Sequence, residues 1–534
     1  MLEGLRRSMR GGAGWSPALL RGVTTQILQE GTVREVAGAP QTGALPFDAI
    51  PHSPGNSWIK VLRLWKSNSL ETLHYTQERL FQQLGPIYRE KLGKTTSVNV
   101  MLPEDAVQLF QVEGTQPRRM AVTPWLVHRH IRHHKCGLFL LNGQDWRLNR
   151  KMLNQDVISP AGVRQYLPLL DTVAQDFSRL LQRRLQNNAR GTTTISVKED
   201  LFCFTAEASN FALYGERLGL LGSNPRPEAL KFIRALNKML ETTLHLLYLP
   251  PGLARLIYPH IWEQHLRSWD HIFEHADKCI QNIYQELCLG RPLRYTGIMA
   301  ELLIKADLSL ESIKANMTEL TAGSVDTTAY PLLFLLFELA RNPEVQAALR
   351  EEVLAVERAG IGASGNLSEL INGLPLIRGA IKEILRLYPV GIMLQRYLSK
   401  STVLQNYNIP AGTLCNVALY PMGRSPAVFT CPERFDPRRW LGKDNNFRSL
   451  PFGFGVRQCI GRRFAESEMV LFLRHILKNF QVETMSREDL KTVHHFILMP
   501  HSHPLLTFRA LKSDLPSSSP PSLTPALAPF HPSP

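Results

Sequence analysis

Long apolar runs and paired cysteines are both scarce in this sequence. The best apolar runs, such as 331–339, are about half as long as the ~20 residues of a membrane-spanning helix, so none is expected. The seven cysteines form no C-x-x-C pair and no zinc-finger spacing. Their odd number disfavours a disulfide scaffold, and a reducing compartment fits better.

Acidic residues are also in deficit. The chain has 46 Asp and Glu against 61 Lys and Arg, a formal net charge of +15. This excess indicates an acidic partner, which can be nucleic acid, an anionic membrane, an acidic protein or an anionic cofactor. No aromatic and basic residues interleave as in nucleic-acid-binding proteins, so no nucleic-acid partner is expected. A hydrophobic content of 44% over 534 residues predicts a globular protein with a sizeable core.

The first thirty residues contain no Lys and only two acids, Glu3 and Glu30, beside several Arg, Ser and Thr. That composition is typical of an organelle transit peptide, and a plain disordered terminus is the alternative. We therefore expect a transit peptide at 1–34, a folded body at 35–512, which by length is one unusually large domain or two to four ordinary ones, and a disordered tail at 513–534. The tail is rich in Ser and Pro and cannot bury enough apolar surface to fold.

Helical periodicity dominates the body of the chain, and strand-like alternation is limited to short pieces. The pattern predicts a mainly α fold with small β-sheets. Helices are expected at 70–84, 163–184, 227–249, 268–287, 309–341, 343–359 and 374–387, and strands at 97–102, within 402–417 and at 496–508.

The segment 452–463, FGFGVRQCIGRR, has the strongest chemical character in the chain. Its glycines allow a tight backbone and close approach to a flat or bulky group. Cys459 is followed by a predicted amphipathic helix, 461–479, whose N-terminal N–H groups, together with Arg457, favour a thiolate. A thiolate is a nucleophile or a metal ligand, whereas the alternative for a lone cysteine is burial in the core.

A second motif, TAGSVDTT at 321–328, interrupts a long apolar helix. Gly323 and Thr327 are one turn apart and share a face. The glycine removes bulk and the hydroxyl can bond the loosened carbonyl, which makes a notch for dioxygen and water. Asp326 beside it can relay protons. The alternative is a Ser/Thr bend in a core helix.

Two further pairs lie on helix faces. Glu383 and Arg386 are three residues apart, which suits an ion pair. Trp146 and Arg150 are four residues apart and present an N–H donor and a guanidinium that can bind one carboxylate. Alone, the Glu383 pair is typical of a solvated surface pair, and the Trp146 pair is equally compatible with an ordinary surface position.

The order F-x-x-G-x-R-x-C-x-G resembles the haem-binding loop of the cytochromes P-450. The resemblance implies a single large cytochrome P-450 fold, with haem b between the long central helix and the cysteine loop. It implies Cys459 as the axial ligand of the iron, a thiolate that favours O–O cleavage. The residues implied to bind haem are Cys459, Arg457, Phe452, Trp146, Arg150, Arg119 and Arg396.

The same resemblance gives the other motifs a role. It implies that Gly323, Asp326 and Thr327 form the catalytic oxygen-activation segment. Glu383 and Arg386, together with Arg434 of the P-E-R-F segment at 432–435, are implied to form a buried ionic network under the haem loop. Removing one member of such a network leaves a buried charge unpaired.

Longer stretches, including 45–58, 207–220 and 498–510, resemble the mitochondrial steroid 11-beta-hydroxylase and aldosterone synthase group. This implies hydroxylation of corticosteroid precursors at carbon 11 and carbon 18, from 11-deoxycorticosterone to corticosterone and aldosterone, and from 11-deoxycortisol to cortisol. Gly297 and Ala329 are more similar to aldosterone synthase. Alternatives are a mitochondrial P-450 for another sterol and a non-catalytic haem-binding protein.

The substrate pocket implied by this group is mostly apolar. Arg132 is expected to hydrogen-bond the polar side chain of the steroid, and Met393 replaces an expected bulky aromatic. The aligned positions are Trp125, Arg132, Phe139, Trp269, Glu319, Ala322, Met393 and Phe496.

The resemblance also implies partners and a location. Electrons come from NADPH through a ferredoxin reductase and a [2Fe–2S] adrenodoxin-type ferredoxin, which is acidic and docks on basic residues. The expected docking residues are Arg378, Lys382, Arg462 and Arg463. The expected location is the matrix side of the mitochondrial inner membrane, where the apolar segment 246–258 dips into the bilayer surface or, alternatively, forms a buried loop.

Overall fold

The computed structural model describes residues 43–66, 70–157, 159–188, 190–222, 225–289, 297–305, 307–361, 365–442 and 447–511. The predicted transit peptide at 1–34 and the predicted tail at 513–534 lie outside the described residues.

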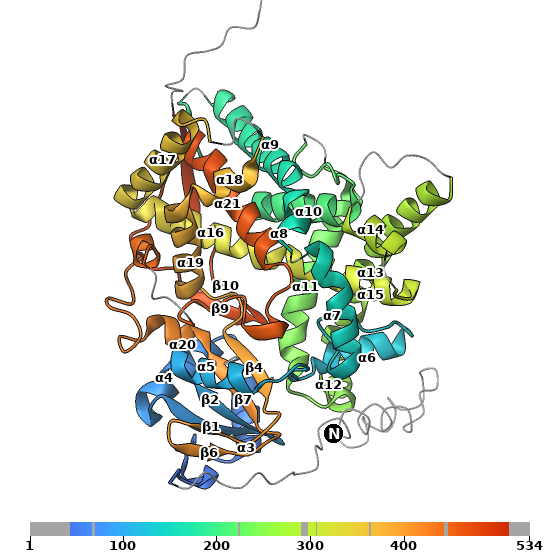
Figure 1. Cartoon of the computed structure of the whole chain (residues 1–534), viewed down its shortest axis with the longest axis vertical. Coiled ribbons are helices and arrows are strands. Elements are labelled where there is room, and N and C mark those ends of the chain that lie inside the picture. Colours follow the sequence, from blue (N-terminus) through green and yellow to red (C-terminus); the bar gives the residue numbers. More distant parts are fainter. Residues whose placement is uncertain are drawn as a thin grey trace, which may run out of the picture.

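Helices make up most of the molecule, and a smaller part at the lower left of Figure 1 contains the largest sheet. The predicted mainly α architecture with small sheets is confirmed. The helices are α3 (Ser57–Lys66), α4 (Leu73–Leu84), α5 (Pro103–Val112), α6 (Thr123–Ile131), α7 (Gly143–Val157), α8 (Pro160–Arg164), α9 (Leu167–Gln186), α10 (Lys198–Tyr214), α11 (Pro227–Leu247), α12 (Pro251–Ile257), α13 (Pro259–Cys288), α14 (Ile298–Lys305), α15 (Leu310–Ser324), α16 (Asp326–Arg341), α17 (Pro343–Arg358), α18 (Leu367–Asn372), α19 (Pro375–Leu387), α20 (Leu419–Arg424) and α21 (Arg462–Asn479).

The largest sheet joins the N-terminal part of the chain to the segment before the cysteine loop. Its strand order is β1-β2-β7-β4, in which β2 and β7 run parallel and the other pairs are antiparallel. Val98 of β2 pairs with Cys415 of β7, which pairs in turn with Arg396 of β4. The strands are β1 (Ile87–Leu92), β2 (Thr95–Val100), β4 (Met393–Tyr397) and β7 (Leu414–Ala418).

Smaller sheets complete the fold. One has the order β3-β11-β8, and two are two-stranded, β5 with β6 and β9 with β10. The predicted strand at 496–508 is two strands, and the predicted short strands within 402–417 are present. The bounds are β3 (Thr192–Ser196), β5 (Thr402–Leu404), β6 (Tyr407–Ile409), β8 (Phe480–Glu483), β9 (Thr492–His495), β10 (Ile497–Pro500) and β11 (Leu505–Ala510).

The predicted long helix at 309–341 forms, but it is broken into α15 and α16 at Val325. Pro331 lies inside α16, where it has no N–H to donate to the carbonyl one turn earlier. The span Leu310–Arg341 is long and apolar enough to cross a membrane, yet 78% of its most apolar window is buried in the fold. It is therefore placed as a core helix.

The core surrounds α16. This helix packs against α10, α19 and β8, and most of its apolar side chains, including Leu335 and Phe337, are fully buried. Helix α21 packs against α9 and α17 and begins three residues after Cys459. The core thus fixes the broken helix and the cysteine loop relative to one another.

Candidate active site

Cys459 lies at the end of the loop that precedes α21. Its backbone N–H donates to the carbonyl of Phe452 at 2.7 Å, which closes the loop. Burial raises the pKa of the Cys459 thiol, against the opposing effects of the Gly461 N–H and the charges of Arg150 and Arg119. The N-terminus of α21 and the nearby arginines are therefore not sufficient to produce the expected thiolate. A bound metal cation would deprotonate a coordinating thiol outright.

The notch predicted in the long helix is present. The hydroxyl of Thr327 donates to the carbonyl of Gly323 at 2.6 Å. Both residues are exposed although their neighbours Ala322 and Asp326 are buried, and a Cβ on Gly323 would meet nothing within 4 Å. Cys459 also has accessible surface, although the protein atoms around its thiol desolvate it and raise its pKa. Gly323, Thr327 and Cys459 are therefore accessible, whereas the residues that flank the notch are buried.

Asp326 points away from the notch. It is 1% exposed, and both of its carboxylate oxygens lack a hydrogen-bond partner within the described part of the chain. Burial raises its pKa to about 7, and Lys198 opposes that shift. The raised pKa favours the protonated Asp326 carboxyl, and passing its proton to Thr327 requires a rotamer change or a bridging water.

Four arginines predicted to bind haem gather around the cysteine loop. The Arg457 guanidinium lies 4.7 Å over the Trp146 ring and donates to the carbonyls of Pro117 (2.8 Å) and Leu141 (2.5 Å). Burial, followed by repulsion from the other three, lowers the pKa of Arg457 to about 8. The four arginines are Arg119, Arg150, Arg396 and Arg457.

This cluster is short of negative charge. Among its described ion pairs, only Arg396 binds a carboxylate, that of Glu113 at 2.8 Å. The Nε atoms of Arg150 and Arg457 are buried with no partner in the described chain. Burial lowers the pKa of Arg119 and Arg150 to about 10. A group carrying carboxylates would relieve this excess, which fits the two propionates of haem.

The loop motif needs a glycine at position 455 for a steric reason. Its φ is +65°, a left-handed conformation that favours glycine, and a Cβ there would overlap the Glu113 carboxylate. Because Glu113 also holds Arg396, the glycine admits the acid that positions one of the arginines.

The ionic network under the loop differs from prediction in one member. Glu383 binds Arg386 at 2.8 Å, as expected, but its second cation is Arg439 at 3.1 Å. The Arg434 side chain is exposed, so its predicted place in the network is wrong, and it contributes only its carbonyl to Arg386. A turn at Cys431, with φ +48°, and the following helical turn Pro437–Trp440 bring Arg439 back to Glu383.

The predicted aromatic pocket residues do assemble. Trp125 lies 4.8 Å from Trp269, 5.2 Å from Phe139 and 5.2 Å from Phe496, measured between ring centroids. The Trp125 N–H donates to Thr243 at 2.8 Å, so its polar atom is satisfied. Ala322 is buried beside the notch, and Met393 is half-buried at the start of β4.

The two polar pocket residues are engaged elsewhere. Arg132 follows the end of α6, is 43% exposed and forms two hydrogen bonds with Asp270 at 2.7 and 2.9 Å, rather than facing the pocket. The Glu319 carboxylate accepts from the backbone N–H groups of Gly137 and Phe139, each at 2.8 Å. Steroid contacts by these two side chains therefore need these bonds to break.

Sequence reasoning missed Arg129, one turn before Arg132. It is 1% exposed, and its guanidinium lies 3.8 Å over the Trp269 ring. Helical spacing from Trp125 could have found it, because residues four apart share a face.

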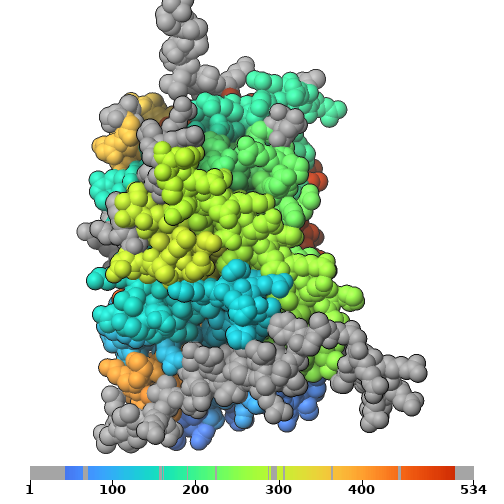
Figure 2. Space-filling model, turned by 90° about the vertical axis from the view of Figure 1, so that its right-hand side faces the viewer, coloured from blue at the N-terminus to red at the C-terminus, as the bar shows by residue number. Residues whose placement is uncertain are grey.

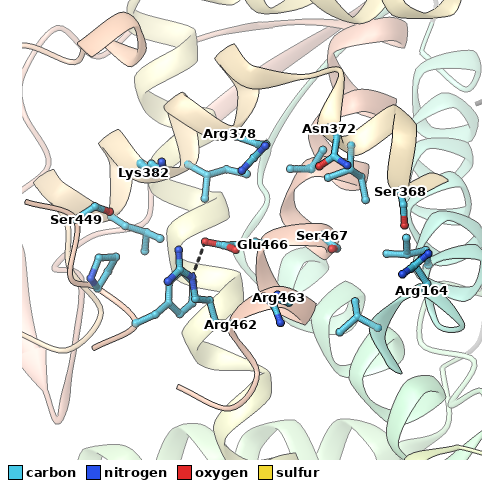
Figure 3. Close-up of a pocket in the computed structure, with 18 residues that line it drawn as sticks. Arg164, Ser368, Asn372, Arg378, Lys382, Ser449, Arg462, Arg463, Glu466 and Ser467 are labelled. Carbon is cyan, nitrogen blue, oxygen red and sulfur yellow. Dashed lines mark hydrogen bonds and ion pairs between the residues drawn. The ribbon is translucent and has the colours of Figure 1, made fainter. Parts of the chain in front are cut away.

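The four predicted docking residues line one hollow of about 490 Å³ (Figure 3). Arg378 and Lys382 come from α19, while Arg462 and Arg463 come from α21. Burial, then the charges of Arg378 and Arg462, lowers the pKa of Lys382. Arg164 of α8, which was not predicted, lines the same hollow.

The predicted membrane segment has apolar side chains both in the core and at the surface. Leu246 and Leu249 are buried, whereas Leu253, Leu256 and Ile257 of α12 are exposed. Helix α3 also exposes apolar side chains, those of Trp58, Ile59 and Leu62. Both helices lie toward the lower end of the molecule (Figures 1 and 2).

Comparison with known proteins extends these findings. The cytochrome P450 family model matches residues 51–508. "Cytochrome P450 11B, mitochondrial" of Aquarana catesbeiana is 55% identical over 475 residues, covering 89% of this chain and 91% of that one. "Cytochrome P450 11B1, mitochondrial" of Ovis aries is 53% identical over 479 residues, covering 89% and 95%.

"Cytochrome P450 11B2, mitochondrial" of Mus musculus is 53% identical over 471 residues, covering 88% and 93% of the two chains. Among solved structures, "Retinoic acid bound cyanobacterial CYP120A1" has a TM-score of 0.70 at 21% identity, covering 88% of this chain and 100% of that one. At that identity the structural likeness shows the fold alone.

Proposed function

Since the chain belongs to the cytochrome P450 family, we propose that it is a mitochondrial haem-thiolate monooxygenase that hydroxylates corticosteroid precursors at carbon 11 and carbon 18. The identity of 53–55% to relatives named P450 11B, 11B1 and 11B2 supports this choice over another sterol. The single observation that carries the proposal is that Gly323, Thr327 and Cys459 are each accessible, although buried residues flank the notch.

The residues present fit haem b. Cys459 is an exposed residue whose sulfur would bind the iron, and Phe452 lies within the same loop. The arginine cluster defined above, with Trp146, would hold the propionates, because Arg396 alone of its four members binds a carboxylate among the described ion pairs. Bound haem supplies the iron that activates dioxygen, and the thiolate favours O–O cleavage.

The chain's own residues then prepare the reaction. Gly323 leaves room for dioxygen, and the Thr327 hydroxyl is held in that room by its bond to the Gly323 carbonyl. Asp326, whose pKa is about 7, supplies protons from the buried side of the helix. The aromatic group around Trp125 excludes water and orients an apolar ligand.

The choice between carbon 11 and carbon 18 rests on packing near the notch. Ala329, two residues after Thr327, is fully buried and small, which eases a shift of the steroid toward carbon 18. Position 297 needs a glycine for a different reason, because a Cβ there would lie 2.7 Å from the carbonyl oxygen of Leu213. It acts through helix packing and not through a substrate contact.

An acidic [2Fe–2S] ferredoxin of the adrenodoxin type, reduced by NADPH through its reductase, is the proposed electron donor. The hollow in Figure 3 supports this, because Arg378, Lys382, Arg462 and Arg463 line it together, and Glu466 bound to Arg462 is the one acid among its lining residues. Complementary charge of this kind speeds association and weakens with salt.

We place the protein on the matrix side of the mitochondrial inner membrane. The relatives' names include "mitochondrial", and the exposed apolar residues of α3 and α12 suit peripheral insertion into a bilayer surface. In this proposal 1–34 is the transit peptide, 35–512 the catalytic domain and 513–534 a tail without assigned function.

The discriminating experiment is a product profile of the purified protein with ferredoxin, ferredoxin reductase, NADPH and 11-deoxycorticosterone. Corticosterone with aldosterone supports both activities, and corticosterone alone restricts the enzyme to carbon 11. No oxidised steroid would remove the substrate assignment. A non-catalytic haem protein is disfavoured because it needs neither the notch nor Asp326.

A further inference from the structure

A short segment, residues 137–141, crosses between the broken helix and the cysteine loop; we call it the strap. Its backbone N–H groups are directed at α15. Those of Gly137 and Phe139 donate to Glu319 at 2.8 Å each, that of Leu140 to Glu319 at 3.4 Å, and that of Leu138 to Asn316 at 2.8 Å.

The other edge of the strap meets the arginine cluster. Its carbonyls at Phe139 and Leu141 accept from Arg119 at 2.7 Å and Arg457 at 2.5 Å. Arg457 is two residues before Cys459. The strap thus links α15 to both arginines and, through Arg457, to the cysteine loop.

Contact between the strap and α15 is as close as backbone permits. A Cβ on Gly137 would lie 2.5 Å from the Ala315 carbonyl oxygen and 2.7 Å from the Glu319 carboxylate. Asn316, fully buried, extends the contact by donating to Asn149 of α7 at 2.6 Å. The spacing is therefore fixed by direct packing as well as by hydrogen bonds.

Only a carboxylate suits this position. Glu319 offers two acceptor oxygens to three N–H groups, whereas a glutamine would present one oxygen and an NH₂ group. Arg129 balances the charge at 3.9 Å and donates to His128, which in turn donates to Asp270. The Glu319 side chain is 3% exposed.

Glu319 is one helical turn before Gly323, so the two share a face of α15. We propose that Glu319 is a positioning residue that, through the strap, fixes the oxygen notch relative to the Cys459 loop. This inference rests on the proposed function. A displacement of about 1 Å at such a site can cost on the order of 100-fold in rate.

The test is Glu319→Gln in the haem-loaded enzyme, with Glu311→Gln as control, an exposed acid in the first turn of the same helix. Hydrogen exchange at the Gly137 and Phe139 amides should quicken about ten-fold or more, because their acceptor is impaired. Steroid product per NADPH should fall about ten-fold, while KM changes by less than about two-fold. The control should match the wild type in all three.

Two results would overturn the proposal. Unchanged amide exchange would show that Glu319 does not hold the strap. A raised KM with unchanged kcat and product yield would make Glu319 a substrate contact instead.

If Glu319→Gln loses its haem, a second variant tests the proposal. Gly137→Ala keeps the charge but displaces the strap, and it should lower product per NADPH in the same way; an unchanged yield would contradict the proposal. A wild type that oxidises no steroid would refute the proposed function alone, since amide exchange tests the strap without turnover.

Discussion

The Thr327 hydroxyl donates to the carbonyl of Gly323, one turn earlier, at 2.6 Å. This bond uses the hydroxyl hydrogen, so the oxygen remains an acceptor toward the open space beside Gly323. The break at Val325 therefore places a fixed polar oxygen where the helix has least bulk.

Replacing this hydroxyl tests its role in proton delivery. Thr327→Val keeps the size of the side chain and removes the hydroxyl. We expect steroid product per NADPH to fall about ten-fold or more, with the electrons recovered as hydrogen peroxide, since positioned proton transfer contributes on the order of 10²–10⁴-fold. Ser324→Ala is the control, because it removes a hydroxyl that lies between Gly323 and Thr327 in the sequence but bonds the Thr321 carbonyl instead. A Thr327→Val enzyme with full coupling would exclude the hydroxyl from the chemistry.

Asp326 gives a stability prediction with a defined sign. Its folded pKa, about 7, exceeds the ordinary aspartate value of 3.8, so the folded state holds a proton that the unfolded state loses between these pH values. The contribution of Asp326 to the free energy of unfolding is therefore fully present below pH ~4 and declines as pH rises toward ~7. Relative to wild type, Asp326→Asn should gain on the order of 4 kcal/mol across this window, measured by urea unfolding. A difference that does not vary with pH would contradict the raised pKa.

The ionic network around Glu383 predicts different losses of stability for variants of Arg439 and Arg434. Arg439→Ala removes a hydrogen bond to the buried Glu383 carboxylate and should cost about 1.5–3 kcal/mol of unfolding free energy. Arg434→Ala should cost less than about 0.5 kcal/mol, because its side chain is exposed and its carbonyl is retained. Denaturant unfolding of the two variants side by side decides between them, and the reverse order would restore the sequence-based assignment.

Ferredoxin docking is tested at Lys382. Lys382→Gln should raise the Kd for an acidic [2Fe–2S] ferredoxin about three- to ten-fold at low salt and less at high salt. Arg164→Gln should act in the same direction because Arg164 lines the same hollow. Lys478→Gln, at the far end of α21 and paired with Glu357, is the control. Equal Kd values for Lys382→Gln and wild type, by titration calorimetry, would place docking elsewhere.

The sequence was most informative where a motif is contiguous. The cysteine loop and the Gly323–Thr327 pair could be predicted because their partners lie within one or two turns of the same segment. The Arg439 contact could not, because it depends on a left-handed turn at Cys431 that no local pattern indicates. Glu319 was assigned to substrate because nothing in the sequence reveals that N–H groups about 180 residues away require its oxygens.

Helix α10 and strand β4 were not predicted for a related reason. Twelve of the seventeen residues of α10 are buried, so its sequence shows little alternation of apolar and polar faces. Strand β4 is held by pairing with β7, and β7 in turn runs parallel to β2, more than 300 residues earlier. Such pairings are fixed by the whole fold.

The central claim is that the Cys459 sulfur binds haem iron. The most direct measurement is the absorption spectrum of the reduced carbon monoxide complex of Cys459→Ser, with Cys288→Ser, an exposed cysteine, as control. We predict that the control keeps the red-shifted Soret band of a thiolate-bound haem and that Cys459→Ser loses it. A Cys459→Ser protein that retains this band would contradict the assignment, and with it the proposed oxygenase chemistry.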